Sequence, residues 1–198
     1  MPFEVQAHRG NDPFRLKRLL VGRPTSVELD VGMTPEGRLI VSHERDLSDA
    51  TGMTLDDARA IVGETPLVVE VKCAPPETAS PAAFAHALRP HLKHVSVTSF
   101  DERVLIEVHA RCTRTPTTIL FAEHLRQATV ATTLGPTHEL VNRDLVEAAH
   151  GVGMRVVPWT VNAANRMAEL IELGVDGVVT DFPSLAHALL VSRLRPAA

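Results

Sequence analysis

Short β-branched segments alternate with helical segments along the whole 198-residue chain, and this alternation limits the fold more than any other feature. Strands that alternate with helices form parallel sheets with crossover connections. Eight strand segments are predicted, at residues 4–8, 26–31, 67–72, 94–100, 117–121, 139–142, 154–161 and 177–180. Eight such units predict an α/β fold, a closed (β/α)8 TIM barrel, more compact than the ~250 residues that are typical.

Helical patterns follow most of these strands. They are predicted at residues 13–21, about 54–62, 81–92, 101–111, 125–132, 143–151, 163–173 and 184–194, and the pattern at 125–132 is weak. Asn11 or Asp12 is available to cap the first helix, and Gly174 can end the helix at 163–173 in a left-handed conformation. No linker, repeat or low-complexity tract interrupts the chain, so we expect a single domain over residues 1–198.

A small insertion is expected at about residues 32–66, between the second and third barrel strands. Residues 34–37 read Thr-Pro-Glu-Gly, a type I turn pattern, and residues 38–43 then form the second arm of a β-hairpin. Counting back from this turn pairs Met33 with Arg38 and places His43 opposite Glu28. The hairpin would therefore bring an imidazole beside an acidic strand.

Composition excludes several classes of protein. The hydrophobic content of 44% and charged content of 22% are those of an ordinary globular domain. A net charge of −4 without a basic run argues against nucleic acid and anionic membranes as partners. Apolar runs are too short for a transmembrane helix. Residues 1–10 show no export signal and the two cysteines no disulfide framework, so the expected compartment is the cytoplasm.

The segment Val-Glu-Leu-Asp-Val at residues 27–31 places two carboxylates on one face of a strand. Glu28 and Asp30 would repel each other unless a cation lies between them or one of them holds a proton. A solvated acidic edge strand is the alternative explanation of this pentapeptide. In a barrel whose strands are covered by helices, the aliphatic face is buried and the acids face inward.

Polar residues gather at the carboxyl ends of the predicted strands, where barrels of this class carry their active sites. These residues include His8, Arg9, Glu28, Asp30, Glu70, Lys72, Ser99, Asn142, Trp159, Asn162 and Asp181. Three carboxylates suit a hard divalent ion such as Mg²⁺ or Ca²⁺, and basic residues beside it would balance an anion such as phosphate. Two histidines could exchange protons with a reacting group.

These residues occur within motifs that resemble those of the glycerophosphodiester phosphodiesterase family. The matching stretches are His8-Arg9-Gly10, residues 28–31 (Glu-Leu-Asp-Val), residues 39–44 (Leu-Ile-Val-Ser-His-Glu), residues 69–72 (Val-Glu-Val-Lys), Ser99-Phe100, residues 159–162 (Trp-Thr-Val-Asn) and residues 174–183 (Gly-Val-Asp-Gly-Val-Val-Thr-Asp-Phe-Pro). They follow the family's order over nearly the whole chain, and the ordered set is far more specific than any one triplet.

The resemblance implies metal-dependent hydrolysis of glycerophosphodiesters to glycerol 3-phosphate and an alcohol, by a phosphoric diester hydrolase of lipid and glycerol metabolism. It implies Mg²⁺ or Ca²⁺ as the cofactor and a small phosphodiester as the substrate, and it leaves the oligomeric state open. The implied roles are metal ligation by Glu28, Asp30 and Glu70, acid/base catalysis by His8 and His43, and substrate binding by Arg9, Lys72, Phe100 and Trp159.

The chain departs from the family pattern in two places. Asn11-Asp12-Pro13-Phe14 stands where the family usually has Pro-Glu-Asn-Thr, and Asn11 or Asp12 could substitute for the missing side chains. The insertion between the second and third strands is also shorter than in the family. A shorter insertion covers less of the pocket, which predicts a more open site or reliance on a partner chain.

Several alternatives stay open at this point. Glu70 and Lys72 could form a plain ion pair, and Trp159 could belong to the core. Asn162 is expected to cap the helix that follows it, and Asp181 to cap the last helix or close the barrel. The nucleophile could be water or a substrate hydroxyl, and the latter would give a cyclic phosphate from a lysophospholipid. A non-catalytic barrel that binds a phospho-ligand is the competing function.

Overall fold

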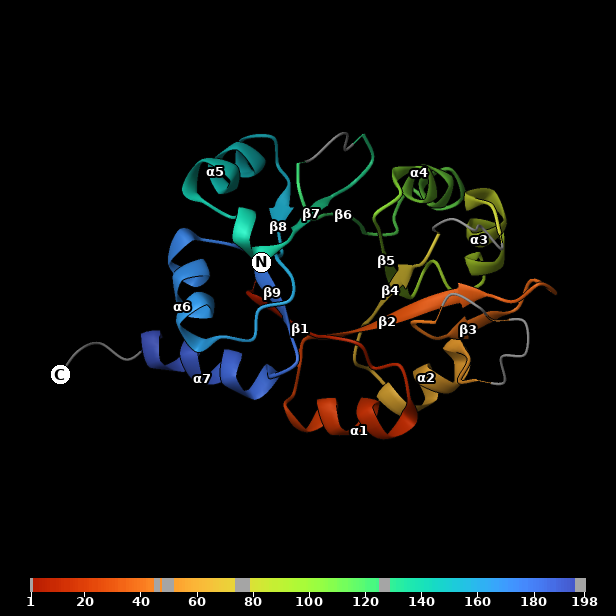
Figure 1. The fold of residues 1–198 in the computed structure, drawn as a ribbon, viewed down its shortest axis with the longest axis horizontal. Coiled ribbons are helices and arrows are strands. Elements are labelled where there is room, and N and C mark those ends of the chain that lie inside the picture. The colour runs from red at the N-terminus through yellow and green to blue at the C-terminus, as the bar shows by residue number, and fades with distance from the viewer. Residues whose placement is uncertain (1, 45–46, 48–51, 74–78, 125–128, 195–198) are drawn as a thin grey trace.

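The computed structural model describes residues 2–44, 47, 52–73, 79–124 and 129–194, and within them eight parallel strands surround one axis (Figure 1). The strands are β1 Glu4–Ala7, β2 Ser26–Met33, β4 Leu67–Val71, β5 Val95–Ser99, β6 Thr117–Phe121, β7 Thr133–Pro136, β8 Arg155–Val156 and β9 Gly177–Thr180. Their order in the sheet is β8-β7-β6-β5-β4-β2-β1-β9. A ninth strand, β3 Leu39–Val41, pairs antiparallel with β2.

Backbone hydrogen bonds join the two ends of this sheet. The Asp176 N–H donates to the Val156 carbonyl at 2.8 Å, and the Val179 N–H donates to the Pro158 carbonyl at 2.9 Å. These bonds link the β8 segment to the β9 segment and make the barrel nearly closed. The predicted α/β TIM-barrel class is therefore confirmed.

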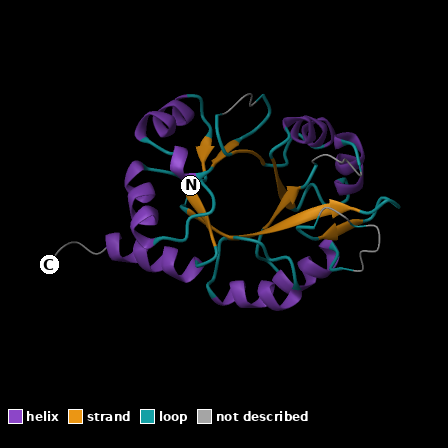
Figure 2. Ribbon diagram, in the orientation of Figure 1, coloured by secondary structure: helices purple, strands orange, loops and turns teal. Residues whose placement is uncertain are grey.

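Helices surround the strands on the outside of the barrel (Figure 2). They are α1 Pro13–Val21, α2 Leu55–Val62, α3 Pro81–Leu88, α4 Glu102–Arg111, α5 Arg143–Gly151, α6 Ala164–Leu173 and α7 Pro183–Leu194. The hydrophobic core lies between strands and helices, where the outward-facing Val27, Leu29 and Val31 of β2 are fully buried. Since strand side chains alternate, the other face of β2 presents Glu28 and Asp30 to the barrel interior.

Local sequence signals fix several helix ends as predicted. The Asp12 carboxylate accepts hydrogen bonds from the backbone N–H groups of Phe14 and Arg15, and it thereby caps α1. Gly174 ends α6 with a φ of 86°, in the left-handed region. Asn162 does not cap α6 as predicted, because its side chain bonds to Asp181 and Thr180 instead.

The sixth barrel strand lies earlier in the chain than predicted. It is β7, Thr133–Pro136, and the segment predicted as a strand at 139–142 instead overlaps a 3-10 helix, His138–Leu140. Residues 129–132 are not helical, and residues 125–128 of the weak predicted helix lie outside the described residues. The short Thr-Leu-Gly-Pro strand lacks a period-2 pattern, and Gly and Pro normally indicate a turn.

The hairpin forms, but its register differs from the prediction by one residue. Met33 pairs with Leu39 rather than with Arg38, so His43 is not opposite Glu28 in the ladder. The turn itself is as expected, with the Gly37 N–H donating to the Thr34 carbonyl. Gly37 has a φ of 83° and adds one residue after the turn, which shifts the register.

No helix among the described residues is long and apolar enough to cross a membrane. The excursion between β2 and β4 holds β3 and α2, in agreement with the small insertion predicted there.

Gly37→Ala is expected to destabilise the protein by about 1 kcal/mol, because a side chain disfavours the left-handed conformation. Gly151→Ala, in helix α5 with open space around its Cα, is the matched control and should be neutral or stabilising. Chemical denaturation of both variants measures the difference. Equal stability of the two would contradict the role given to Gly37.

Candidate active site

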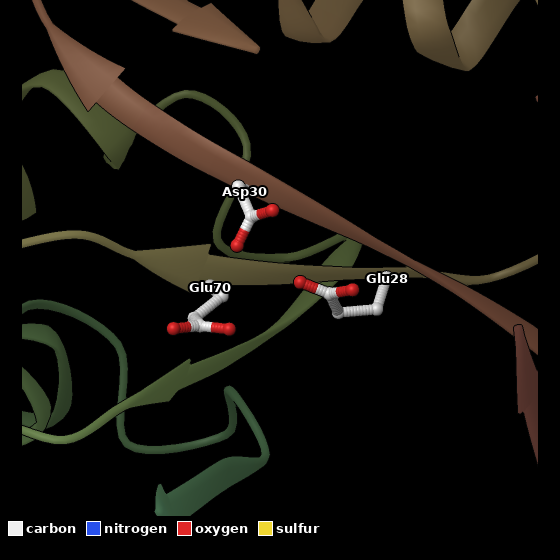
Figure 3. Close-up of side chains that lie close together, drawn as sticks. All are labelled: Glu28, Asp30 and Glu70. Atoms are coloured by element: carbon white, nitrogen blue, oxygen red, sulfur yellow. The ribbon is translucent and has the colours of Figure 1, made fainter. Parts of the chain in front are cut away.

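Three carboxylates meet inside the barrel at the carboxyl ends of β2 and β4. Figure 3 shows Glu28 and Asp30 on β2 and Glu70 on the neighbouring strand with their carboxyl groups close together. One oxygen from each lies within 4.8 Å of the others. Asp30 and Glu70 are direct register partners, and all three side chains are buried. The third predicted acid, Glu70, therefore lies beside the two predicted acids of β2.

Burial and mutual repulsion perturb these acids in different directions. Burial, then the charges of Asp30 and Glu70, raise the pKa of Glu28 well above its ordinary value. Burial also raises the pKa of Glu70, and the charge and hydrogen bond of Lys72 offset only part of this rise. For Asp30 the burial effect is outweighed by Lys72, Asn11 and Arg9, and its pKa falls below the ordinary value.

Two cations lie beside the acids. The Lys72 ammonium is 2.8 Å from Asp30 Oδ1 and also contacts Glu70 Oε1. The Arg9 Nε lies 3.5 Å from Asp30 Oδ2. With all groups ionised, three carboxylates and two cations leave one net negative charge. Glu28 Oε1 is buried and has no hydrogen-bond partner among the described residues.

The loop after β1 is held against the acids by its own backbone. Arg9 has a φ of 54°, an unusual conformation for a residue with a side chain, and its N–H donates to Glu28 Oε2 at 2.7 Å. Asn11 Nδ2 donates to Asp30 Oδ2 at 2.6 Å, and Asn11 Oδ1 accepts from the Asp30 N–H. Asn11 thus occupies part of the site at the position where the family motif differs.

His8 is oriented by Asp181, which follows β9. His8 Nδ1 lies 3.2 Å from Asp181 Oδ1, and the same carboxylate accepts from Arg15 and from Asn162. Arg15 Nε also donates to the Arg9 carbonyl at 2.6 Å. Burial lowers the pKa of His8, and the Asp181 carboxylate offsets part of this effect.

His43 reaches the site although the predicted register was wrong. Its Nε2 lies 2.7 Å from the Arg9 guanidinium, and its side chain is exposed. Since arginine can only donate, this contact requires an unprotonated Nε2 and places the ring proton on Nδ1. Arg9 therefore links His43 to Asp30 and Glu28.

One cavity of about 320 Å³ connects most of these groups. Of the nine predicted site residues, eight line it, namely His8, Arg9, Glu28, His43, Glu70, Lys72, Phe100 and Trp159. Asp30 is fully buried and lies outside the lining. Phe100 and Trp159 contact each other edge to face, with ring centroids 5.4 Å apart, and Trp159 Nε1 donates to the Gly135 carbonyl. This bond and contact hold Trp159 as a wall of the cavity rather than in the core.

Arg15 was not predicted from the sequence, and Asp181 and Asn162 were predicted only as structural residues. Arg15 lies in the first turn of α1 and reaches Asp181, 166 positions along the chain, at 2.5 Å. No local pattern indicates such a contact. The motif Thr180-Asp181-Phe182-Pro183 was the one available signal, because it follows a strand at the catalytic end of the barrel.

Comparison with known proteins identifies the family of the chain. The model of the glycerophosphoryl diester phosphodiesterase family matches residues 82–185. The chain belongs to this family. A glycerophosphodiester phosphodiesterase of Bacillus subtilis is similar to it, with 28% identity over 91% of this chain and 84% of the relative. The family's members are phosphoric diester hydrolases.

Solved structures of glycerophosphodiester phosphodiesterases have the same fold. A structure from Parabacteroides distasonis superposes with a TM-score of 0.78 at 18% identity, and covers 98% of this chain and 100% of its own. A phosphodiesterase from Oleispira antarctica, solved with the product sn-glycerol-3-phosphate, gives a TM-score of 0.78 at 18% identity, over 95% of this chain and 96% of its own. At these identities the likeness establishes the barrel alone.

The metal-free protein is expected to lose stability as the pH rises, through Glu28. A carboxyl group whose pKa is raised on folding stabilises the folded state below its unfolded value of 4.5, and this contribution is lost as the pH rises through the folded pKa. Glu28→Gln, which cannot ionise, should therefore gain melting temperature relative to wild type between pH 5 and pH 8 in EDTA. Comparing the two proteins cancels the opposite contribution of His8, whose pKa is lowered. A difference that is the same at both pH values would contradict this electrostatic account.

Proposed function

We propose that the chain hydrolyses glycerophosphodiesters to glycerol 3-phosphate and an alcohol at the Glu28, Asp30 and Glu70 group. The observation that carries the proposal is the meeting of three buried carboxylates with two cations and two imidazoles around one cavity. The family and its Bacillus subtilis member support phosphodiester hydrolysis. The groups fit one anionic substrate bound together with one divalent ion.

The three acids are suited to hold a divalent ion. Carboxylate oxygens are hard ligands of the kind that Mg²⁺ and Ca²⁺ prefer, and Glu28 Oε1 is a buried acceptor without a partner among the described residues. A divalent ion changes the net charge of the acids and cations from one negative to one positive, which suits a phosphodiester monoanion. When bound, the ion would polarise the phosphoryl group as a Lewis acid.

Arg9 and Lys72 are proposed to bind the phosphoryl oxygens. Both line the cavity beside the acids, and Lys72 spans Asp30 and Glu70 while Arg9 lies against Asp30 and His43. Fixed cations at this position would stabilise the charge that develops on the phosphoryl oxygens during the reaction. Phe100 and Trp159 would flank the alcohol of the substrate.

His8 and His43 are proposed as the acid/base pair. Asp181 holds His8 Nδ1, which leaves Nε2 as the ring atom that can exchange a proton with the substrate. Burial lowers the pKa of His8 and so favours its neutral form, which is suited to accept the proton of the nucleophile. His43 contacts Arg9 through an unprotonated Nε2, so it would first take up a proton and give up this contact, and would then donate the proton to the leaving alkoxide.

Product analysis by ³¹P NMR tests the proposed reaction. Wild-type protein with Mg²⁺ or Ca²⁺ should convert glycerophosphocholine to glycerol 3-phosphate. Accumulation of a cyclic phosphate from a lysophospholipid would assign the nucleophile to a substrate hydroxyl instead. No turnover of either substrate would favour a barrel that only binds phospho-ligands.

His8→Ala and His43→Ala should each lower kcat by about 10²–10⁴-fold, because each removes one proton transfer. Calorimetric titration should show that both variants still bind the divalent ion. His109→Ala, in α4 and remote from the acids in the sequence, serves as the control and should keep wild-type turnover. Near-normal activity of either site variant would remove that histidine from the mechanism.

Glu70→Gln should weaken Mg²⁺ or Ca²⁺ binding by at least about tenfold, since it removes one of three charged ligands while it preserves the shape of the side chain. The measurement is isothermal titration at pH 7.5 beside Glu147→Gln, an exposed residue of α5. Unchanged affinity would mean that Glu70 serves only as the partner of Lys72.

A further inference from the structure

The loop between β1 and α1 carries His8 and Arg9, which are proposed to act on the substrate, and it consists only of residues 8–12. Because this loop is short, the first turn of α1 lies beside it, and Arg15 of that turn reaches back to the loop's own backbone. Arg15 is not among the residues that line the cavity. Any effect of Arg15 on the reaction therefore passes through other residues.

The Arg15 guanidinium binds three acceptors at once. Its Nε donates to the Arg9 carbonyl at 2.6 Å, and its Nη2 donates to the His8 carbonyl at 3.2 Å and to Asp181 Oδ1 at 2.5 Å. The same Asp181 oxygen lies 3.2 Å from His8 Nδ1. Arg15 thus holds both the main chain of His8 and the carboxylate that orients its ring.

Two consecutive peptide units of the loop lie between Arg15 and Glu28. In the His8–Arg9 peptide the carbonyl accepts from Arg15, and the N–H donates to Glu28 Oε2 at 2.7 Å. In the Arg9–Gly10 peptide the carbonyl again accepts from Arg15, and the N–H donates to the Glu28 carbonyl at 2.8 Å. Since the C=O and N–H of a trans peptide point in opposite directions, each peptide is held from both sides.

The conformation of the loop explains why both sides matter. Arg9 has a φ of 54°, in a region that residues with a side chain rarely adopt. Such a conformation persists only where the surrounding contacts determine it. Glu28 supplies these contacts on one side and Arg15 on the other, so we expect the loop to become mobile when Arg15 is removed.

The chemistry of the side chain fits this role. A guanidinium group carries five N–H donors in one rigid plane and stays charged at all relevant pH values. It can therefore bind two carbonyl oxygens and a carboxylate together. A lysine ammonium is a single point charge and does not reproduce this fork.

We infer that Arg15 is a positioning residue that holds the His8-Arg9-Gly10 loop and Asp181 in place against Glu28. It thereby fixes the proposed proton acceptor and the arginine proposed to bind phosphate. The effect on turnover rests on the proposed function, whereas the holding of the loop does not. A plain ion pair between Arg15 and Asp181 is the simpler role, and its loss would leave the two peptides unaffected.

Amide hydrogen exchange, measured by NMR on the full chain in EDTA, separates these two roles. Arg15→Ala should speed exchange at the Arg9 and Gly10 amides by at least about tenfold, because their peptides lose the bonds on one side. The amide of the fully buried Leu29 in β2 should keep its wild-type rate. Arg18→Ala, at an exposed arginine of the same helix, is the matched control and should leave all three amides unchanged.

Turnover of glycerophosphocholine gives the second readout. The kcat of Arg15→Ala should fall by about 10- to 100-fold, as is typical when the partner of a site residue is removed. The Arg15 side chain is 31% exposed, so a free guanidinium ion can enter the space that it leaves. Guanidinium chloride at about 50 mM should raise the kcat of this variant by at least about threefold, and sodium chloride should not.

Arg15→Lys keeps the charge and covers the case in which Arg15→Ala does not fold. Faster exchange at Arg9 and Gly10 is expected there too, because the ammonium does not reach all three acceptors. Unchanged exchange at these two amides in the folded variants, or an equal increase at Leu29, would overturn the inference. A wild-type kcat in Arg15→Ala, or a loss that guanidinium does not reverse, would also overturn it. Absent turnover in wild type would instead contradict the proposed function, and the exchange rates would still decide the role of Arg15.

Discussion

The mutual repulsion of three buried carboxylates is the constraint on which the rest of the site depends. Glu28, Asp30 and Glu70 lie on adjacent strands whose register is fixed by the packing of their outward aliphatic neighbours against the helices. The barrel thus forces the acids together, and Lys72, Arg9 and Asn11 partly compensate the charge. The negative charge that remains is the basis of the proposed divalent-ion site.

The loop after β1 is held in place by contacts with the same acids. Arg9 adopts a left-handed conformation because its N–H bonds to Glu28 and its carbonyl accepts from Arg15. Arg15 is in turn bonded to Asp181, which also orients His8. The acids, the arginine proposed to bind phosphate and the proposed proton acceptor therefore share one network, so that a change at any member is expected to disturb the others.

Much of the barrel could be predicted from the sequence because its strands and helices carry strong local patterns. The helices at Pro13–Val21 and Arg143–Gly151 and the strands at Thr117–Phe121 and Gly177–Thr180 have the predicted bounds. The prediction was wrong at β7, whose Gly and Pro indicate a turn until neighbouring strands pair with it. It was wrong by one residue in the hairpin, since the conformation of Gly37 adds a residue that a turn pattern does not count.

The candidate site was likewise predictable only in part. Its acids, cations and histidines stand at strand ends and could be predicted, whereas Arg15 and the depth of the cavity depend on contacts between distant segments.

The central claim is that Glu28, Asp30 and Glu70 together hold one divalent ion. Anomalous diffraction from crystals grown with Mn²⁺ tests it most directly. One strong peak within about 2.0–2.6 Å of an oxygen of each acid is predicted. No peak there, with Lys72 still between Asp30 and Glu70, would contradict the account.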